Sequence, residues 1–216
     1  MNSNDDIVKF IIQNKNTLGE FHMDALFQVL NTVEYVIHNN IEGDFVEIGV
    51  FKGLMVVAIL AKLNQLKVTN RLVHLYDTFS GMTEPCDRDI DAYGNNAKTI
   101  LEEIKCFSPV QHVQNNVDMI DYPKENIIYH IGDILNETYE NVPKKISFLR
   151  LDTDWYESTK YELELFEKNV SFKGIITSDD YNWWKGCTQA VNEYNYGKNI
   201  NLNHMNPHGA WWVKNV

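Results

Sequence analysis

The sequence lacks the features that mark several large protein classes. Its three cysteines, Cys86, Cys106 and Cys187, are far apart and form no C-x-x-C pair, which argues against a disulfide framework and a zinc site. No apolar run reaches the roughly 18 residues of a membrane span. The N-terminus has no basic segment followed by an apolar one, so no signal peptide is expected. We therefore expect free thiols, no membrane span and a cytoplasmic location.

Positive charge is also scarce. Lysine and arginine number 19 against 30 acidic residues, and the formal net charge is −11. Binding to a nucleic-acid backbone usually needs a basic surface, so a nucleic-acid partner is not expected. An excess of carboxylates is instead compatible with the binding of a cation.

The pattern of apolar residues predicts an α/β protein. Residues 1–40 have helical periodicity and are expected to form an N-terminal helical extension or cap, followed by a main domain over 41–216. In this domain short apolar segments alternate with helical ones, which predicts a mostly parallel sheet with helices on both faces. Predicted strands are 44–50, 71–78, 126–133, 145–152 and 174–180, predicted helices are 53–66, 156–170 and 187–196, and 200–204 and 209–214 are expected to form a closing pair.

Acidic residues stand at or near the end of every one of the five predicted strands. They are Glu47, Asp77, Asp133, Asp152 and the pair Asp179 and Asp180. In parallel α/β sheets ligands bind beyond the carboxyl ends of the strands. This regular placement therefore predicts a functional site at that edge of the sheet.

The first two strand ends favour a nucleotide-like ligand. Gly49 and Gly53 give a glycine turn before a helix, although the G-x-G-x-x-G spacing of dinucleotide-binding oxidoreductases is missing. An acid such as Asp77 at the end of the second strand typically accepts hydrogen bonds from ribose hydroxyls. Asp77 as a turn cap and Gly53 as a helix-packing glycine remain alternatives.

The next strand end extends this predicted site. Gly132 and Asp133 are placed beside the adenine edge, with a plain turn as the alternative. Thr78 and Ser80 follow Asp77 directly and are included in the predicted cofactor site.

Asp152, Asp179 and Asp180 form the predicted metal site. The fourth and fifth strands are expected to be neighbours, which would bring these three carboxylates together. Carboxylates at one point disfavour each other's ionised forms unless positive charge compensates. An oxygen-rich site of this charge suits Mg²⁺, or Mn²⁺ as a substitute. Asp154 is either an additional acid of this site or a cap of the following helix.

Several longer segments together resemble one known family. They are VEIGVFKG (46–53), LYDTFSGM (75–82), LRLDTDWYEST (149–159), TSDDY with the following GC-x-x-AV (177–191), and GAWWVK (209–214). The sequence is similar in these segments to the TylF/MycF-type macrocin O-methyltransferases. The resemblance covers roughly residues 40 to 216.

The resemblance implies a Rossmann-like class I methyltransferase fold with a seven-stranded sheet. It also implies S-adenosylmethionine as methyl donor and Mg²⁺-dependent methylation of a sugar hydroxyl. Carried over by position, Glu47, Gly49 and Asp77 would contact the donor, and Asp152, Asp179 and Asp180 the metal. The segment GDILNET differs from the G-x-F pattern that is usual in the family, and the acceptor is not defined by the resemblance.

The expected chemistry needs a base to accept the hydroxyl proton. Asp152 is the first candidate and Asp154 the second, with His204 and His208 in the C-terminal segment as alternatives. His74 and His130 lie inside strand segments and are expected in the core.

Two further features concern the acceptor. The long polar segment 79–95 is expected to form a lid. Trp183 and Trp184 follow the metal pair and offer either a stacking surface for a sugar or ordinary packing.

Three other functions were weighed against this hypothesis. They are a metal-independent methyltransferase, an NAD-dependent oxidoreductase and a non-catalytic nucleotide-binding module. The missing dinucleotide motif argues against the second, and the complete set of acidic strand ends against the third. The sequence leaves the oligomeric state open, a homo-oligomer included.

Overall fold

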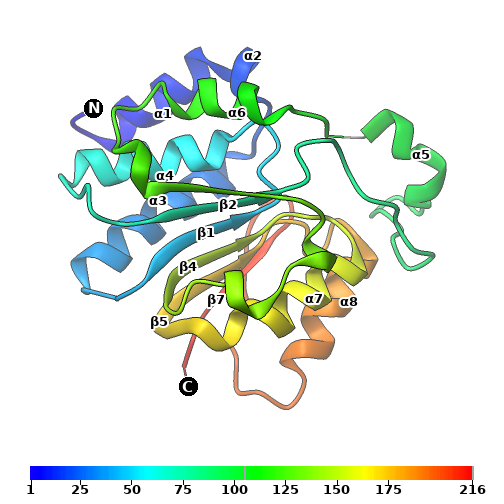
Figure 1. Ribbon diagram of the computed structural model, residues 1–216. Coiled ribbons are helices and arrows are strands. Elements are labelled where there is room, and N and C mark those ends of the chain that lie inside the picture. Colours follow the sequence, from blue (N-terminus) through cyan, green and yellow to red (C-terminus); the bar gives the residue numbers. More distant parts are fainter. Residues whose placement is uncertain (105, 216) are drawn as a thin grey trace.

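The computed structural model describes residues 1–104 and 106–215, in which a seven-stranded sheet lies between two layers of helices (Figure 1). The strands are β1 Asp44–Ile48, β2 Val73–Asp77, β3 Ile127–Ile131, β4 Ile146–Leu151, β5 Val170–Ser178, β6 Asn203–His204 and β7 Ala210–Val213. The α-helices are α1 Asn4–Gln13, α2 Lys15–Leu18, α3 Met23–His38, α4 Leu54–Gln65, α5 Ala97–Ile104, α6 Val110–Val117, α7 Tyr156–Phe166 and α8 Lys185–Asn195.

The strand order is β3-β2-β1-β4-β5-β7-β6, and β1 to β5 are parallel. Only β7 runs antiparallel to its neighbours β5 and β6. The predicted mostly parallel sheet, its five parallel strands and the closing pair are thus confirmed. The carboxyl ends of β1, β2, β4 and β5 lie at one edge of this sheet, where the predicted site residues are found.

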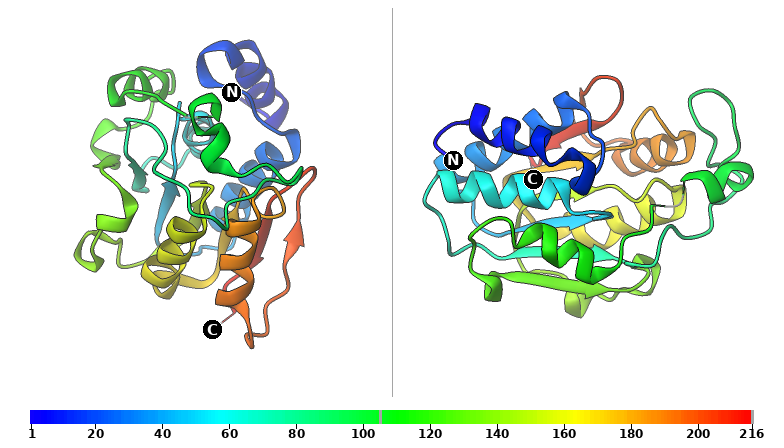
Figure 2. Two further views of the ribbon diagram at one scale, coloured as in Figure 1. Left: turned by 90° about the vertical axis from the view of Figure 1, so that its right-hand side faces the viewer. Right: turned by 90° about the horizontal axis from the view of Figure 1, so that it is seen from above.

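Helices cover both faces of the sheet (Figures 1 and 2). Helices α1, α3, α4 and α6 lie on one side, and α7 and α8 pack together on the other. Helix α4 is apolar nearly all round its surface and buries ten consecutive residues from Leu54 to Leu63, because α1 and α3 pack on its outer side.

The predicted N-terminal helices are present as α1 to α3, and they belong to the main core. Ile7, Leu26 and Val29 are fully buried in the same apolar cluster as Phe45 and Val56. The boundary at residue 40 therefore separates two patterns of secondary structure that share one continuous core.

One predicted boundary was wrong, and two helices were missed. The helix expected over 156–170 ends at Phe166, a short 3-10 helix covers Glu167–Asn169, and β5 begins at Val170. The buried Glu167 bonds to Lys214 and Tyr194, so a tertiary contact fixes this break. Helices α5 and α6 were not predicted at all, since each has only eight residues and buries few of them.

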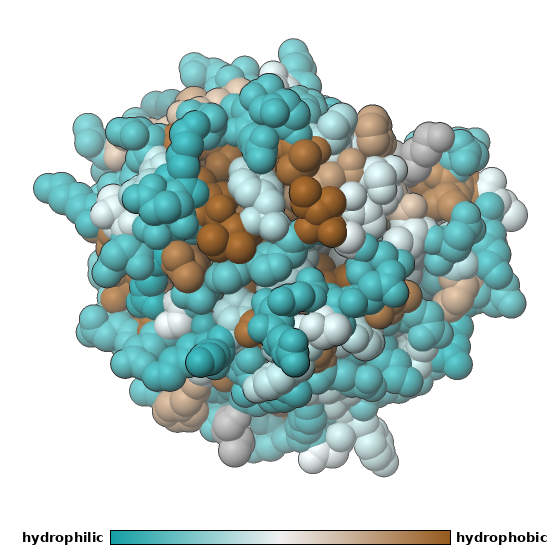
Figure 3. Space-filling view, in the orientation of Figure 1, coloured by the Kyte–Doolittle hydropathy of each residue, from teal (hydrophilic) through white to brown (hydrophobic). Residues whose placement is uncertain are grey.

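Exposed surface is mostly polar. Figure 3 shows hydrophilic residues over most of one face, with hydrophobic residues in a patch above its middle. Within the part of the chain that is described, no helix is both long and apolar enough to cross a membrane. The cysteines are free thiols, as expected.

Candidate active site

Two cavities open at the carboxyl edge of the sheet. Cavity A lies over β1, β2, β3 and β4, and cavity B lies between the segment before α3 and the ends of β1, β4 and β5. Both are lined by Phe51 and Asp152. The two cavities therefore approach the same carboxylate from different sides.

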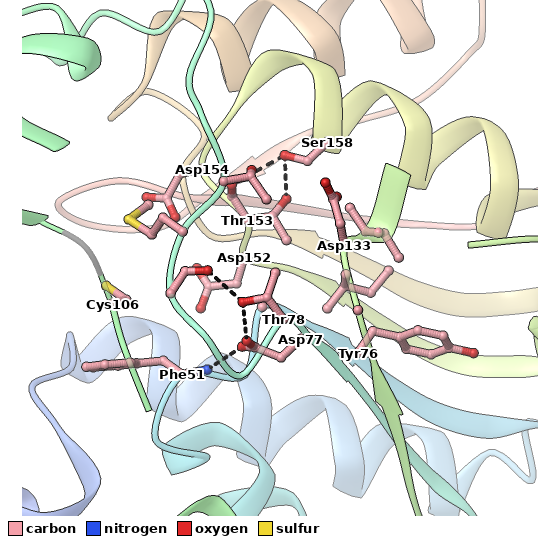
Figure 4. A pocket seen from close by; sticks show the side chains of 17 residues that line it. Phe51, Tyr76, Asp77, Thr78, Cys106, Asp133, Asp152, Thr153, Asp154 and Ser158 are labelled. Carbon is pink, nitrogen blue, oxygen red and sulfur yellow. Dashed lines mark hydrogen bonds between the residues drawn. The ribbon is translucent and has the colours of Figure 1, made fainter. Parts of the chain in front are cut away.

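Cavity A receives most of the residues predicted for the cofactor (Figure 4). Those that line it are Gly49, Asp77, Thr78, Gly132 and Asp133. Sequence reasoning missed five other side chains labelled there, Phe51, Tyr76, Cys106, Thr153 and Ser158. None of them belongs to a residue type that alone indicates a site.

Three predicted cofactor residues lie elsewhere. Glu47 lines cavity B, and its carboxylate bonds to Arg150. Gly53 precedes α4, and a side chain there would touch Val113 of α6, which is the helix-packing alternative. Ser80 is exposed and does not line cavity A.

Gly49 is required by the close approach of two strand ends. Its φ is +84°, and an added Cβ would lie 1.9 Å from the carbonyl oxygen of Asp152. Any larger residue would push β4 away from β1. The glycine turn thus positions Asp152 as well as shaping cavity A.

The Asp77 carboxylate organises the turn after β1. One oxygen accepts hydrogen bonds from the backbone N–H groups of Val50 and Phe51, at 2.7 and 2.9 Å, and the other accepts from Phe79 at 2.7 Å. Asp133 similarly accepts from the backbone of Leu135 at 3.0 Å. Both acids therefore act as turn caps in this structure while lining cavity A.

Arg150 is the main feature of the site that sequence reasoning did not single out. Its buried guanidinium lies 2.9 Å from Glu47, 2.6 Å from Asp152 and 2.9 Å from Asp179. It supplies one positive charge among three carboxylates. Burial raises the pKa of Glu47 to about 8 in spite of this partner.

The three predicted metal residues are linked to one another through neighbouring groups. Arg150 joins Asp152 to Asp179, and the Asp180 carboxylate accepts the backbone N–H of Asp154 at 3.1 Å. Burial, followed by the charges of Asp154, Asp152 and Asp179, raises the pKa of Asp180 well above its usual value. Over residues 1–104 and 106–215, no three His, Cys, Asp or Glu side chains are already arranged as ligands of one ion.

Asp154 is not the helix cap that was considered as its alternative role. Trp155 precedes α7 without a side-chain capping bond, whereas Asp154 accepts a hydrogen bond from the indole of Trp184 at 2.8 Å. Asp154 lines cavity A with a φ of +68°, an uncommon conformation for a residue with a side chain. Burial and the Asp152 charge raise its pKa to about 7.

The histidines fit the expectations from the sequence only in part, since His130 is half-buried and not in the core. His74 is buried, and His130 is stacked on Tyr76 with ring centroids 3.9 Å apart. His208 lines cavity B, and its Nδ1 donates a hydrogen bond to the Asp179 carbonyl at 2.9 Å. His204 is exposed and lines neither cavity.

The segment 79–95 is anchored at several points. The buried Asp89 carboxylate accepts the backbone N–H groups of Tyr156 and Cys86, at 2.8 and 2.7 Å. A side chain on Gly186 would lie 2.0 Å from this carboxylate. The part of the segment around Asp89 is thus fixed on α7 and α8. Residues Gly81 to Thr83, near the start of the segment, line cavity A.

Comparisons with known proteins agree with this architecture. The family model for macrocin-O-methyltransferase (TylF) matches residues 15–214. The chain is 30% identical over 194 residues to demethyldecarbamoylnovobiocin O-methyltransferase of Streptomyces niveus, covering 88% of this chain and 72% of that protein.

Two further similarities extend the comparison. Identity is 28% over 189 residues to the 8-demethyl-8-(2,3-dimethoxy-alpha-L-rhamnosyl)-tetracenomycin-C 4′-O-methyltransferase of Streptomyces olivaceus, covering 83% of this chain and 69% of that protein. The solved structure of the O-methyltransferase NovP superimposes with a TM-score of 0.80 at 25% identity, covering 90% of this chain and 81% of NovP. The chain therefore belongs to the macrocin-O-methyltransferase (TylF) family and is an S-adenosylmethionine-dependent O-methyltransferase.

Proposed function

We propose that this enzyme methylates a hydroxyl group of a sugar, either on a glycosylated small molecule or in a glycan. The observation that carries the proposal is the meeting of cavities A and B at Asp152. A donor in A and an acceptor in B would face each other there. The names of the relatives support a sugar, since one of them includes a rhamnosyl group and a 4′-O-methyl transfer.

Cavity A is assigned to the methyl donor. Gly49 and Gly132 leave space beside the turn, while Asp77, Thr78 and Asp133 offer hydroxyl and carboxylate oxygens to hydroxyl and amino groups. S-adenosylmethionine supplies an electrophilic methyl group on a positively charged sulfur, which suits a cavity with several acids. The residues themselves bind the donor and orient it toward Asp152.

Asp152, Asp179 and Asp180 are assigned to a divalent cation, Mg²⁺ or Mn²⁺. Arg150 occupies one oxygen each of Asp152 and Asp179, and the other oxygen of each has no hydrogen-bond donor among the described residues. Burial first, and then the charges of Asp154, Asp152 and Asp179, raise the pKa of Asp180, and a bound cation would offset both effects. An all-oxygen donor set of this kind fits either ion. The cation would favour the ionised form of the acceptor hydroxyl.

Asp154 is assigned the role of the base. Arg150 donates to Asp152 at 2.6 Å, which makes Asp152 a weaker proton acceptor. Asp154 has only neutral donors around its side chain, and Trp184 holds one of its oxygens in place. The other carboxylate oxygen of Asp154 is therefore held in a fixed orientation. This oxygen accepts the proton of the acceptor hydroxyl.

A metal-independent methyltransferase is the second candidate. Arg150 favours it, because this side chain already places a positive charge beside Asp152 and Asp179. In this alternative the aspartates and Arg150 form a structural network, and Asp154 removes the proton without help from a cation.

One experiment tests the function and separates these candidates. Glycosides, including rhamnosides, are incubated with the enzyme and S-adenosylmethionine, and mass spectrometry is used to detect methylated products. The best acceptor is then assayed after exhaustive treatment with a chelator. We expect turnover to be lost and to return with Mg²⁺ or Mn²⁺, while calorimetry shows nearly unchanged donor binding. Full turnover without metal would establish the metal-independent alternative, and methylation only of acceptors without a sugar would refute the proposed function.

A further inference from the structure

An exposed pair of aromatic rings lies beside cavity B. Tyr93 is 81% exposed, and its ring meets the half-buried ring of Trp183 edge to face with centroids 5.6 Å apart. Trp184, by contrast, is buried and bonded to Asp154. Of the two tryptophans considered as a stacking surface, only Trp183 has an accessible face.

The ring pair is continuous with the reaction site. The Trp183 ring lies 5.5 Å from the ring of His208, measured between centroids. His208 lines cavity B and bonds to the backbone of Asp179. A molecule whose hydroxyl points at Asp152 and Asp179 would therefore extend along His208 toward Trp183 and Tyr93.

The loop that carries Tyr93 is held rigidly. The buried Asp91 carboxylate accepts the backbone N–H groups of Tyr93 and Asn95 at 2.9 and 2.8 Å. Asp91 also pairs with Trp184 in an antiparallel bridge, and Lys185 donates its backbone N–H to Ile90 at 2.9 Å. A large exposed side chain on such a loop costs little conformational entropy when it binds a ligand.

Polar groups surround the rings. A surface cavity of about 560 Å³ lies next to Trp183, and its other lining residues include Ala92, Asn182, Lys185, Gln189 and Asn192. Asn192 uses its oxygen to accept from Tyr181 at 2.9 Å, and its NH₂ group has no partner among the described residues. Flat aromatic rings next to amide and ammonium donors match the two kinds of surface on a pyranose, an apolar C–H face and a rim of hydroxyls.

We propose that Tyr93 and Trp183 form a second saccharide subsite, which binds the pyranose adjacent to the one that is methylated. The proposal rests on the proposed function and makes it more specific. The preferred acceptor is then an oligosaccharide or an oligosaccharide-bearing compound, and a single sugar unit fills only cavity B.

The test compares two probes, methyl α-L-rhamnoside and an α-linked methyl dirhamnoside, titrated into the enzyme with S-adenosylhomocysteine bound. We expect the disaccharide to bind at least about tenfold more tightly than the monosaccharide. W183A and Y93A should each remove most of this gain, and W183F should keep part of it because a ring remains. Y196A is the matched control, since Tyr196 is a 90% exposed tyrosine outside the subsite. Unchanged S-adenosylhomocysteine affinity in each variant shows that the fold is intact.

A disaccharide that binds no better than the monosaccharide would overturn the subsite, as would a gain that persists in both W183A and Y93A. If neither rhamnose probe binds, the same comparison is made on an array of other oligosaccharides, and the absence of any binder that depends on Tyr93 and Trp183 overturns it. Failure of the subsite can be distinguished from failure of the proposed function, because a glycoside can be methylated even when the subsite binds no sugar. Conversely, glycans can bind to the rings without methyl transfer.

Discussion

Asp154 shows how single residues combine strain and chemistry at this site. Its φ of +68° and its bond from Trp184 hold the carboxylate in a conformation that the chain would not adopt freely. Such strain is maintained only when the surrounding structure fixes it, and it is frequent at active sites. Asp152 and Asp154 line cavity A, and the Asp180 carboxylate accepts the backbone N–H of Asp154, so the segments after β4 and β5 bring these acids close together.

We expect Asp154→Asn to lower kcat by about 10² to 10⁴, the usual contribution of a positioned base. Asparagine tolerates a positive φ and can still accept the indole hydrogen bond, so the fold and donor affinity should change little. Steady-state kinetics and calorimetry measure the two quantities. Asp87→Asn is the control, because Asp87 is an exposed acid paired only with Lys98. A kcat within threefold of the wild type would assign the proton transfer to another group.

The acidic strand ends are evident from the sequence, whereas their partner Arg150 is less evident. Arg150 lies inside β4, whose segment is otherwise mostly apolar. Asp152, directly after the strand, is therefore the more evident candidate for a site residue. An arginine in an otherwise buried strand must find carboxylates, since a buried charge is costly without them. That argument points to Glu47 as one partner of Arg150.

At the scale of elements, the pairing of β2 with β3 brings two histidines into contact. His74 and His130 lie 3.0 Å apart across these strands, and His74 also lies 3.3 Å from Asp44. Burial, and then the nearby His74, lower the pKa of His130 to about 4, while Glu137 acts in the opposite direction. The folded state thus favours neutral His130.

The contribution of His130 to the free energy of unfolding should therefore decrease as the pH falls from about 6.5 to about 4. In this range the unfolded chain binds a proton at His130 and the folded chain does not. The stabilisation is complete above pH 6.5 and declines on acidification. For a half-exposed ring, solvent screening limits it to about 1–2 kcal/mol. Urea unfolding at pH 7 and pH 4.5 measures it. We expect His130→Gln to show a smaller loss of stability than the wild type, and equal losses would contradict the assignment.

Long periodic elements were predictable because their own residues determine them. Helix α4 and the strands β1, β2 and β4 have strong apolar patterns, and each was placed close to its observed position. Helix α6 and the start of β5 depend on contacts with distant parts of the chain, such as Gly53 against Val113 and Glu167 against Lys214. Local patterns contain no signal for contacts of this kind.

At the scale of the whole molecule, the site arises from the strand order. The sequence places β4 about a hundred residues after β1, and the sheet makes them neighbours, so that Gly49 touches the backbone of Asp152. Helix α3 then covers the other side of cavity B, and residues from Leu18 to Ala25 line it. The N-terminal helices therefore complete the core and form one wall of cavity B.

The central claim is that methyl transfer to a sugar hydroxyl occurs where cavities A and B meet. The most direct measurement uses S-adenosylmethionine with a deuterated methyl group and a glycoside acceptor, and NMR and mass spectrometry locate the label in the product. The account predicts one labelled methyl group on a sugar oxygen, and the loss of this product in Asp180→Asn, whose donor affinity is retained. A label on nitrogen, on carbon or on a part of the acceptor outside the sugar would contradict it, as would undiminished transfer by Asp180→Asn.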